Sequence, residues 1–183
     1  KFVKLIRSIC PTSYIIIGGV NYNAVLSVPK LRFPVDEYTV YNFHCYEPHI
    51  FTHQAAYWVF YMPSDFRIGY PKTISEYREA SRKLTDDETT AIFAESTGEI
   101  GVDFFDKIFA PAIEAARKAD VPLYCGEYGV INLADNEDKI RWLNDIHAAF
   151  RKYGIGHALW NYKEKDFGFV DERFAPIKDK FIQ

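Results

Sequence analysis

The sequence predicts an α/β fold with a parallel sheet, on the strength of three observations. Strand-like and helix-like segments alternate along the chain, which is the pattern of βα units. The first strand-like segment is a continuous Ile-rich run, which is typical of a strand buried on both faces of a parallel sheet. The length of 183 residues corresponds to one domain with a sizeable core. This fold class places functional side chains at the carboxyl ends of the strands.

The N-terminal third predicts one helix and two strands. Residues 1–10 have the pattern of the last turns of an amphipathic helix, and Pro11 ends it. The Ile-rich run at 13–20 closes with Gly18 and Gly19. A short helical or irregular connection follows at 21–37, and the second strand is predicted at 38–46.

The middle of the chain holds a long excursion from residue 47 to about residue 90, rich in proline and aromatic residues. It is too long for an ordinary connection, and loops of this length are usually functional. A helix is then predicted over 90–119 by an apolar stripe at Ala94, Ile100, Phe104, Ile108, Ile113 and Ala116.

The C-terminal third continues the alternation of strand and helix. Asp135 or Asn136 is a suitable N-cap for the helix predicted here, and Gly154 is a suitable end. The predicted elements are a strand at 121–128, a helix at 136–153, a strand at 156–162 and a short helix at 175–181.

Composition and charge exclude several classes of function. The formal net charge of −3 and the pI near 6.0, without a Lys/Arg cluster, argue against a nucleic-acid partner. No apolar stretch reaches the roughly 20 residues of a membrane span. The three cysteines are widely spaced and form no metal-binding pattern, so we expect reduced structural thiols, no metal and no cofactor. The 17% aromatic content fits either a large aromatic core or a cleft whose rings stack on sugars.

Three predicted strands end in residues suited to a carbohydrate site. Alternation along the second strand places Asn42, His44 and Tyr46 on one face. The same rule groups Glu127 with Cys125, opposite Gly126 and Tyr128. We expect His44, Tyr46, Glu127 and Trp160 to converge, with Tyr46 or His44 within hydrogen-bonding reach of Glu127.

Each of these residues also has a purely structural interpretation. Glu127 fits a solvated carboxylate at a strand end, His44 a hydrogen-bonded core histidine, and Trp160 a core side chain. His49 and His53 lack metal-ligand spacing and are interpreted as loop contacts.

The strand-end segments together resemble a known family. The segment HCYEP followed by FTHQAAYW, the GEYG turn and the ALWNY strand are similar to the C-terminal half of glycoside hydrolase family 5, a cellulase-type group of (β/α)8 barrels. The resemblance runs from Ser13 to about Asp171. It implies a (β/α)4 half of a TIM barrel whose parallel strands correspond to barrel strands 5–8. By this interpretation, residues 1–183 are one half-barrel domain that begins in the helix after barrel strand 4, with the N-terminal half absent.

The resemblance also implies roles for the site residues. Glu127 matches the nucleophile of a retaining glycosidase, His44 and Tyr46 match the pair that binds substrate and orients the nucleophile, and Trp160 matches the aromatic floor of the glycone subsite. The implied ligand is a polysaccharide or oligosaccharide, and the family suggests a secreted protein.

The family's acid/base glutamate, in an Asn-Glu-Pro motif, has no counterpart in this sequence. Retaining hydrolysis needs two carboxyl groups about 5–5.5 Å apart. Glu47 precedes a proline, but alternation points it away from the face of Tyr46, so we do not expect it to be the donor.

Two functions therefore remain open. One is an endo-β-1,4-glucanase of the cellulase type that is inactive or weakly active because it lacks the acid/base glutamate. The other is a catalytically dead half-barrel that binds carbohydrate or self-associates. Four βα units leave two unpaired strand edges and an open sheet face, which we expect a homodimer or the missing N-terminal half to cover.

Overall fold

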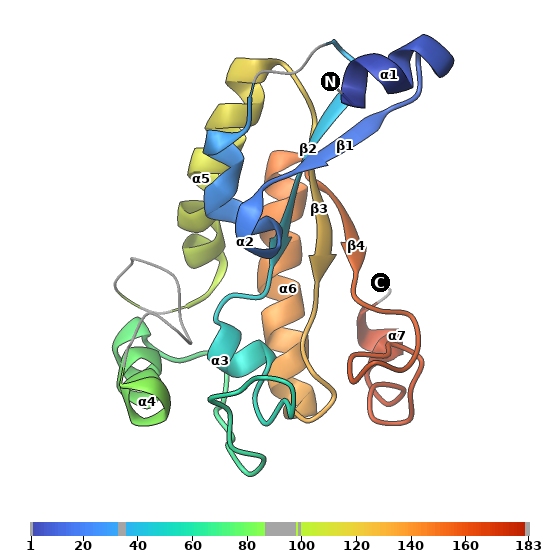
Figure 1. Cartoon of the computed structure of the whole chain (residues 1–183). Coiled ribbons are helices and arrows are strands. Elements are labelled where there is room, and N and C mark those ends of the chain that lie inside the picture. The colour runs from blue at the N-terminus through green and yellow to red at the C-terminus, as the bar shows by residue number, and fades with distance from the viewer. Residues whose placement is uncertain (1, 33–35, 87–97, 99, 182–183) are drawn as a thin grey trace.

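The computed structural model describes residues 2–32, 36–86, 98 and 100–181, and its centre is one four-stranded sheet (Figure 1). All neighbouring strands are parallel and follow sequence order. The predicted parallel sheet is therefore confirmed, and each strand lies within its predicted range. The strands are β1 (Ile15–Gly18), β2 (Thr39–Cys45), β3 (Leu123–Tyr128) and β4 (Gly156–Leu159).

Two long helices, α5 (Val102–Ala119) and α6 (Asn136–Tyr153), pack on the face of the sheet that carries Phe43 and Tyr128. The ring of Phe43 lies 5.1 Å from that of Phe109, and Tyr128 packs edge-on against Phe150. The bounds of α6 are those predicted: the Asp135 side chain accepts hydrogen bonds from two backbone N–H groups of the first turn, and Gly154 ends the helix at φ 64°. Aromatic burial between helices and sheet thus forms the core.

The other predicted helices are shorter than expected. The N-terminal helix α1 spans Phe2–Ile9 and the C-terminal α7 spans Lys178–Phe181. The helix predicted over 90–119 is present from Val102. Residues 90–97 and 99, including Ala94 of the predicted stripe, lie outside the described residues.

The described parts of the connections after β1 and β2 contain four further elements. A four-residue turn, α2 (Val20–Asn23), and a 3-10 helix, η1 (Val25–Lys30), follow β1. The long excursion holds α3 (His49–Thr52) and α4 (Ile74–Thr85). We did not predict α4, although Thr73 and Glu76 form a capping box, a pattern visible in the sequence.

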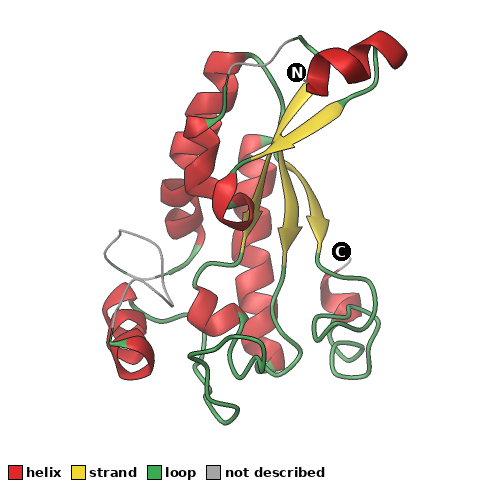
Figure 2. Ribbon diagram, viewed as in Figure 1, coloured by secondary structure: helices red, strands yellow, loops and turns green. Residues whose placement is uncertain are grey.

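The carboxyl ends of β2, β3 and β4 point toward one end of the molecule, where the loops containing α3, α4 and α7 gather (Figures 1 and 2). Side chains that leave these strand ends are therefore brought to one region, as expected for parallel βα units.

A β-bulge in β3 corrects one prediction. Phe43 pairs with Cys125, but the next residue, His44, pairs with Glu127, so Gly126 is an extra residue in β3. Glu127 consequently lies opposite Cys125, not beside it as alternation had suggested. Cys125 and Tyr128 are both buried, whereas Glu127 faces His44.

Candidate active site at the carboxyl ends of the strands

Glu127 and Tyr46 are joined by a hydrogen bond between neighbouring strand ends. The Tyr46 hydroxyl donates to Oε2 of Glu127 at 3.1 Å. Burial, with the nearby negative charge of Glu127, raises the pKa of Tyr46, so this hydroxyl keeps its proton and remains a donor. Its ring is held by edge contacts with His53 and Phe167, at 4.9 and 5.9 Å between ring centroids. Tyr46 is thus positioned to orient the carboxylate.

His44 contacts the same carboxylate oxygen. Its Nδ1 lies 3.5 Å from Oε2 of Glu127, and its Nε2 lies 3.3 Å from the amide nitrogen of Asn23. Since an amide nitrogen only donates, Nε2 is the acceptor and the ring proton is on Nδ1, facing Glu127. Burial lowers the pKa of His44 and so favours this neutral form. The negative charge of Glu127 acts in the opposite direction and is the smaller of the two effects.

Asn23 is a site residue that the sequence analysis missed. It ends a turn in which Asn21, Tyr22 and Asn23 all have left-handed backbone conformations, with φ between 54° and 59°. An added Cβ at Gly18 would lie 2.0 Å from Oδ1 of Asn23, so only glycine lets the amide reach His44. The Gly-Gly pair followed by two asparagines, which tolerate left-handed conformations, was the available signal.

Trp160 follows β4, next to the strand that carries Glu127. Its backbone N–H donates to the carbonyl of Tyr128 at 2.8 Å, which fixes this strand end beside β3. The residue is 40% exposed, so it is not a plain core side chain. The structure therefore brings Glu127, His44 and Tyr46 into contact and places Trp160 on the adjacent strand end.

The two loop histidines contact each other and the loop. Their rings stack with centroids 4.1 Å apart, and Nδ1 of His49 lies 2.7 Å from the Tyr61 hydroxyl. Burial lowers the pKa of His49 to about 4. In the part of the chain that the structure describes, no three His, Cys, Asp or Glu residues are grouped to hold a metal ion. None of the described helices has the length and hydropathy to cross a membrane.

Comparison with known families shows the family of this chain. The model of the family "Cellulase (glycosyl hydrolase family 5)" matches residues 1–166. The chain belongs to glycosyl hydrolase family 5. Its expected resemblance to that family, and the α/β half-barrel order of its strands, are thereby confirmed.

Curated relatives of this family 5 chain share about a third of its residues. Endoglucanase C of Acetivibrio thermocellus is 34% identical over 186 residues, an alignment that covers 100% of this chain and 53% of the relative. Cellodextrinase A of Ruminococcus flavefaciens is 38% identical over 82% of this chain and 37% of its own length. The chain spans about half the length of the first of these relatives.

Solved structures show the same partial coverage. The cellulose synthase subunit Z of Clostridioides difficile superposes with a TM-score of 0.75 at 22% identity, over 99% of this chain and 53% of that structure. A hyperthermophilic endo-beta-1,4-glucanase crystallised with substrate has a TM-score of 0.69 at 26% identity, over 93% of this chain and 46% of its own. The fold is thus about half of a family 5 barrel.

Proposed function

We propose that these residues form the nucleophile half of a retaining β-1,4-glucanase site, with Glu127 as the nucleophile. The observation that carries the proposal is the pair of contacts to one oxygen of Glu127: the Tyr46 hydroxyl at 3.1 Å and His44 Nδ1 at 3.5 Å. Both contacts are made to Oε2, so Oε1 is the oxygen assigned to attack. Membership of the cellulase family and the names of the relatives support a polysaccharide substrate.

The chemistry follows from the roles of two carboxyl groups. Oε1 of Glu127 forms a bond to the anomeric carbon as the glycosidic bond breaks, and the electron pair of that bond goes to the leaving oxygen. The leaving oxygen then needs a proton. Tyr46 holds its proton too tightly and the lowered pKa of His44 leaves it neutral, so neither is a suitable donor near neutral pH.

The proton donor therefore comes from a segment beyond the 183 residues, since their sequence contains no Asn-Glu-Pro motif. We assign it to a complementary half-barrel that pairs with the edge strands β1 and β4. Exposed apolar side chains support such an interface. They are Ile16 on β1 and Phe2, Leu5 and Ile9 on α1. The helix α1 has no buried residue. Endoglucanase C, about twice as long as the matched region, suggests that this complementary part is an N-terminal half of the same fold.

The test is hydrolysis of carboxymethylcellulose by this chain, alone and mixed with a separately produced N-terminal half of endoglucanase C. We expect the chain alone to fall far below the roughly 1–10³ s⁻¹ of ordinary enzymes. The mixture should recover turnover, and Glu127→Gln should remove it. Ordinary rates for the chain alone, abolished by Glu127→Gln, would mean that a donor lies within these residues.

A second candidate function is a half-barrel that binds carbohydrate or self-associates without catalysis. The exposed apolar residues of α1 and β1 favour it, because two copies closing one barrel would cover them. Sedimentation of the chain at micromolar concentration distinguishes a homodimer from a monomer. A dimer that binds glucan without turnover supports this function, and a monomer contradicts the homodimer.

A further inference from the structure

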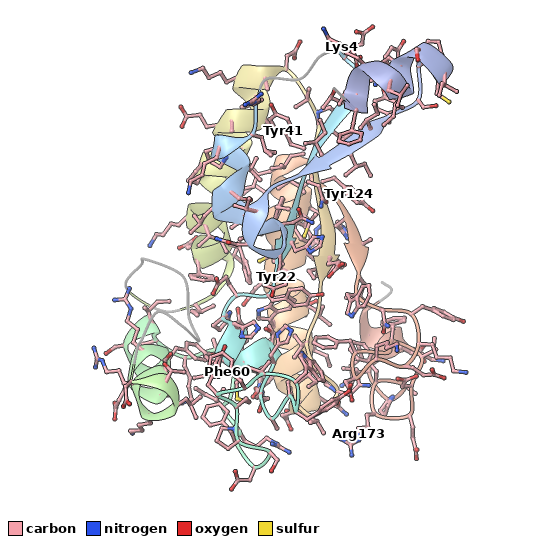
Figure 3. All side chains as sticks on the ribbon, viewed as in Figure 1. Lys4, Tyr22, Tyr41, Phe60, Tyr124 and Arg173 are labelled. Carbon is pink, nitrogen blue, oxygen red and sulfur yellow. The ribbon has the colours of Figure 1, made fainter. Side chains whose placement is uncertain are left out.

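Thr52 is a buried polar residue beside the candidate site, and the roles assigned above do not use it. It is the last residue of α3, which lies beyond the carboxyl ends of β2 and β3 (Figure 3). The residue is 0% exposed. Because buried polar groups are hydrogen-bonded, the partners of Thr52 show which parts of the chain it holds in place.

The hydroxyl of Thr52 holds the backbone of Tyr46. Its Oγ1 donates to the Tyr46 carbonyl at 2.6 Å, and Nδ1 of His53 lies 3.1 Å from the same Oγ1. A carbonyl oxygen only accepts, so the single hydroxyl proton points to Tyr46, and Nδ1 of His53 carries the proton that it donates to Oγ1. Tyr46 follows Cys45, the last residue of β2, so this bond fixes the chain just beyond the sheet.

The backbone of Thr52 holds the segment that follows β3. The N–H of Ile131 donates to the Thr52 carbonyl at 2.9 Å, and Ile131 is also 0% exposed. Ile131 lies shortly after Tyr128, the last residue of β3. Thr52 therefore joins, through two hydrogen bonds, the segment that leaves β2 with Tyr46 and the segment that leaves β3 after Glu127.

We propose that Thr52 is a positioning residue for the nucleophile and acts through Tyr46. This inference rests on the proposed function, which gives Glu127 its role. The bond from the Tyr46 hydroxyl to Oε2 of Glu127 joins the tips of two side chains, whereas the bonds of Thr52 set the spacing of the backbone segments that carry them. A shift of the Tyr46 backbone moves the hydroxyl at the far end of its ring, and a misplacement of about 1 Å can slow a reaction about a hundredfold.

Two substitutions separate the hydroxyl of Thr52 from its shape. Thr52→Val keeps the branched side chain but leaves the Tyr46 carbonyl without this donor, whereas Thr52→Ser keeps the donor. Thr39→Val is the matched control. Thr39 begins β2, at the end of the strand far from Tyr46, and is also 0% exposed. Its Oγ1 has no hydrogen-bond partner among the residues that the structure describes, so its removal breaks no such bond.

The experiment is a double-mutant cycle between Thr52 and Tyr46. It measures the rate at which the 183-residue chain releases the first equivalent of dinitrophenolate from saturating dinitrophenyl β-cellobioside. We expect Thr52→Val to slow this step about tenfold, Thr52→Ser to stay within about twofold of wild type, and Thr39→Val to have no effect. In a Tyr46→Phe background, Thr52→Val should cause no further loss, because the hydroxyl that Thr52 positions is already removed. Losses that simply add would overturn the inference.

A crystal structure of Thr52→Val gives a second readout that does not depend on activity. We expect the Tyr46 hydroxyl to move out of hydrogen-bonding range of Oε2 of Glu127, from its present 3.1 Å. An unchanged distance would overturn the inference. If the wild-type chain releases no dinitrophenolate, the proposed function is wrong, and this distance alone decides whether Thr52 holds Tyr46. Circular dichroism checks folding, and Thr52→Ala replaces Thr52→Val in both measurements if the valine variant does not fold.

Discussion

At the scale of single residues, the candidate site depends on how one carboxylate is held. A glutamate that attacks an anomeric carbon has to stay ionised and keep one orientation. Tyr46 supplies a hydrogen-bond donor to Oε2, and His44, fixed by Asn23, presents its Nδ1 proton to the same oxygen. Hydrogen bonds to a charged group are stronger than those between neutral groups. The Tyr46 hydroxyl makes the shorter of the two contacts, 3.1 Å against 3.5 Å for His44 Nδ1, so it is the one we expect to matter most.

We predict that Tyr46→Phe slows the attack by Glu127 about ten- to a hundredfold, the loss expected for one hydrogen bond to a charged group. The measurement is release of dinitrophenolate from dinitrophenyl β-cellobioside, whose leaving group needs no proton donor. Tyr77→Phe is the control, because it removes a tyrosine hydroxyl that donates its hydrogen bond to the Gly69 carbonyl instead of to Glu127. Equal effects of the two variants would contradict a positioning role for Tyr46.

At the scale of secondary-structure elements, the ends of β3 and β4 are packed too closely for a side chain at Gly129. A Cβ there would lie 2.4 Å from the carbonyl oxygen of Trp160. This oxygen belongs to the backbone, so it cannot rotate away as a side chain can. The same two strand ends carry Glu127 and Trp160. Their relative placement therefore depends on this glycine.

We predict that Gly129→Ala lowers the free energy of unfolding by about 1–3 kcal/mol, the usual cost of overpacking. Gly101→Ala is the matched control: an added Cβ there would have its nearest neighbour at 3.9 Å, so we expect a loss below about 1 kcal/mol, from the N-cap alone. Urea unfolding of both variants measures the difference. A Gly129→Ala variant as stable as wild type would show that the strand ends can separate without cost.

The same elements show how far the sequence alone could lead. Apolar runs and caps located the four strands and α6, because the hydrophobic pattern and the capping residues are local features of the sequence. The bulge at Gly126 was missed, since alternation assumes an unbroken period of two. Asn23 was missed because its role depends on a left-handed turn and on the close approach of Gly18. Both failures concern backbone geometry at the candidate site.

At the scale of the whole molecule, partly buried histidines link stability to pH. Burial lowers the pKa of His49 and of His147 to about 4, and that of His53 well below its usual value. These side chains bind fewer protons in the folded state than in the unfolded state, where the ordinary value is 6.5. Their contribution to stability is therefore complete above pH 6.5 and is lost as the pH falls toward 4.

We predict that the free energy of unfolding decreases between pH 6.5 and about 4.5, with a slope of the order of 1 kcal/mol per pH unit for each such histidine. Urea titrations at several pH values measure it. His147→Gln should flatten the profile, because glutamine does not titrate and can still bond the Tyr128 hydroxyl that His147 contacts at 2.6 Å. A stability that stays constant from pH 7 to pH 5 would contradict the assignment of neutral, buried histidines.

The central claim, that Glu127 is a nucleophile placed in half of a family 5 site, is tested most directly by trapping its glycosyl adduct. Dinitrophenyl β-cellobioside needs no acid to depart, and in a retaining glycosidase the acid/base activates the water of the second step. The 183 residues hold no Asn-Glu-Pro motif that would supply it. We therefore predict a burst approaching one equivalent of dinitrophenolate and a cellobiosyl mass increase on the peptide containing Glu127, both absent in Glu127→Gln. An adduct on another residue, or neither a burst nor an adduct on the peptide containing Glu127 in the 183-residue chain, would contradict the account.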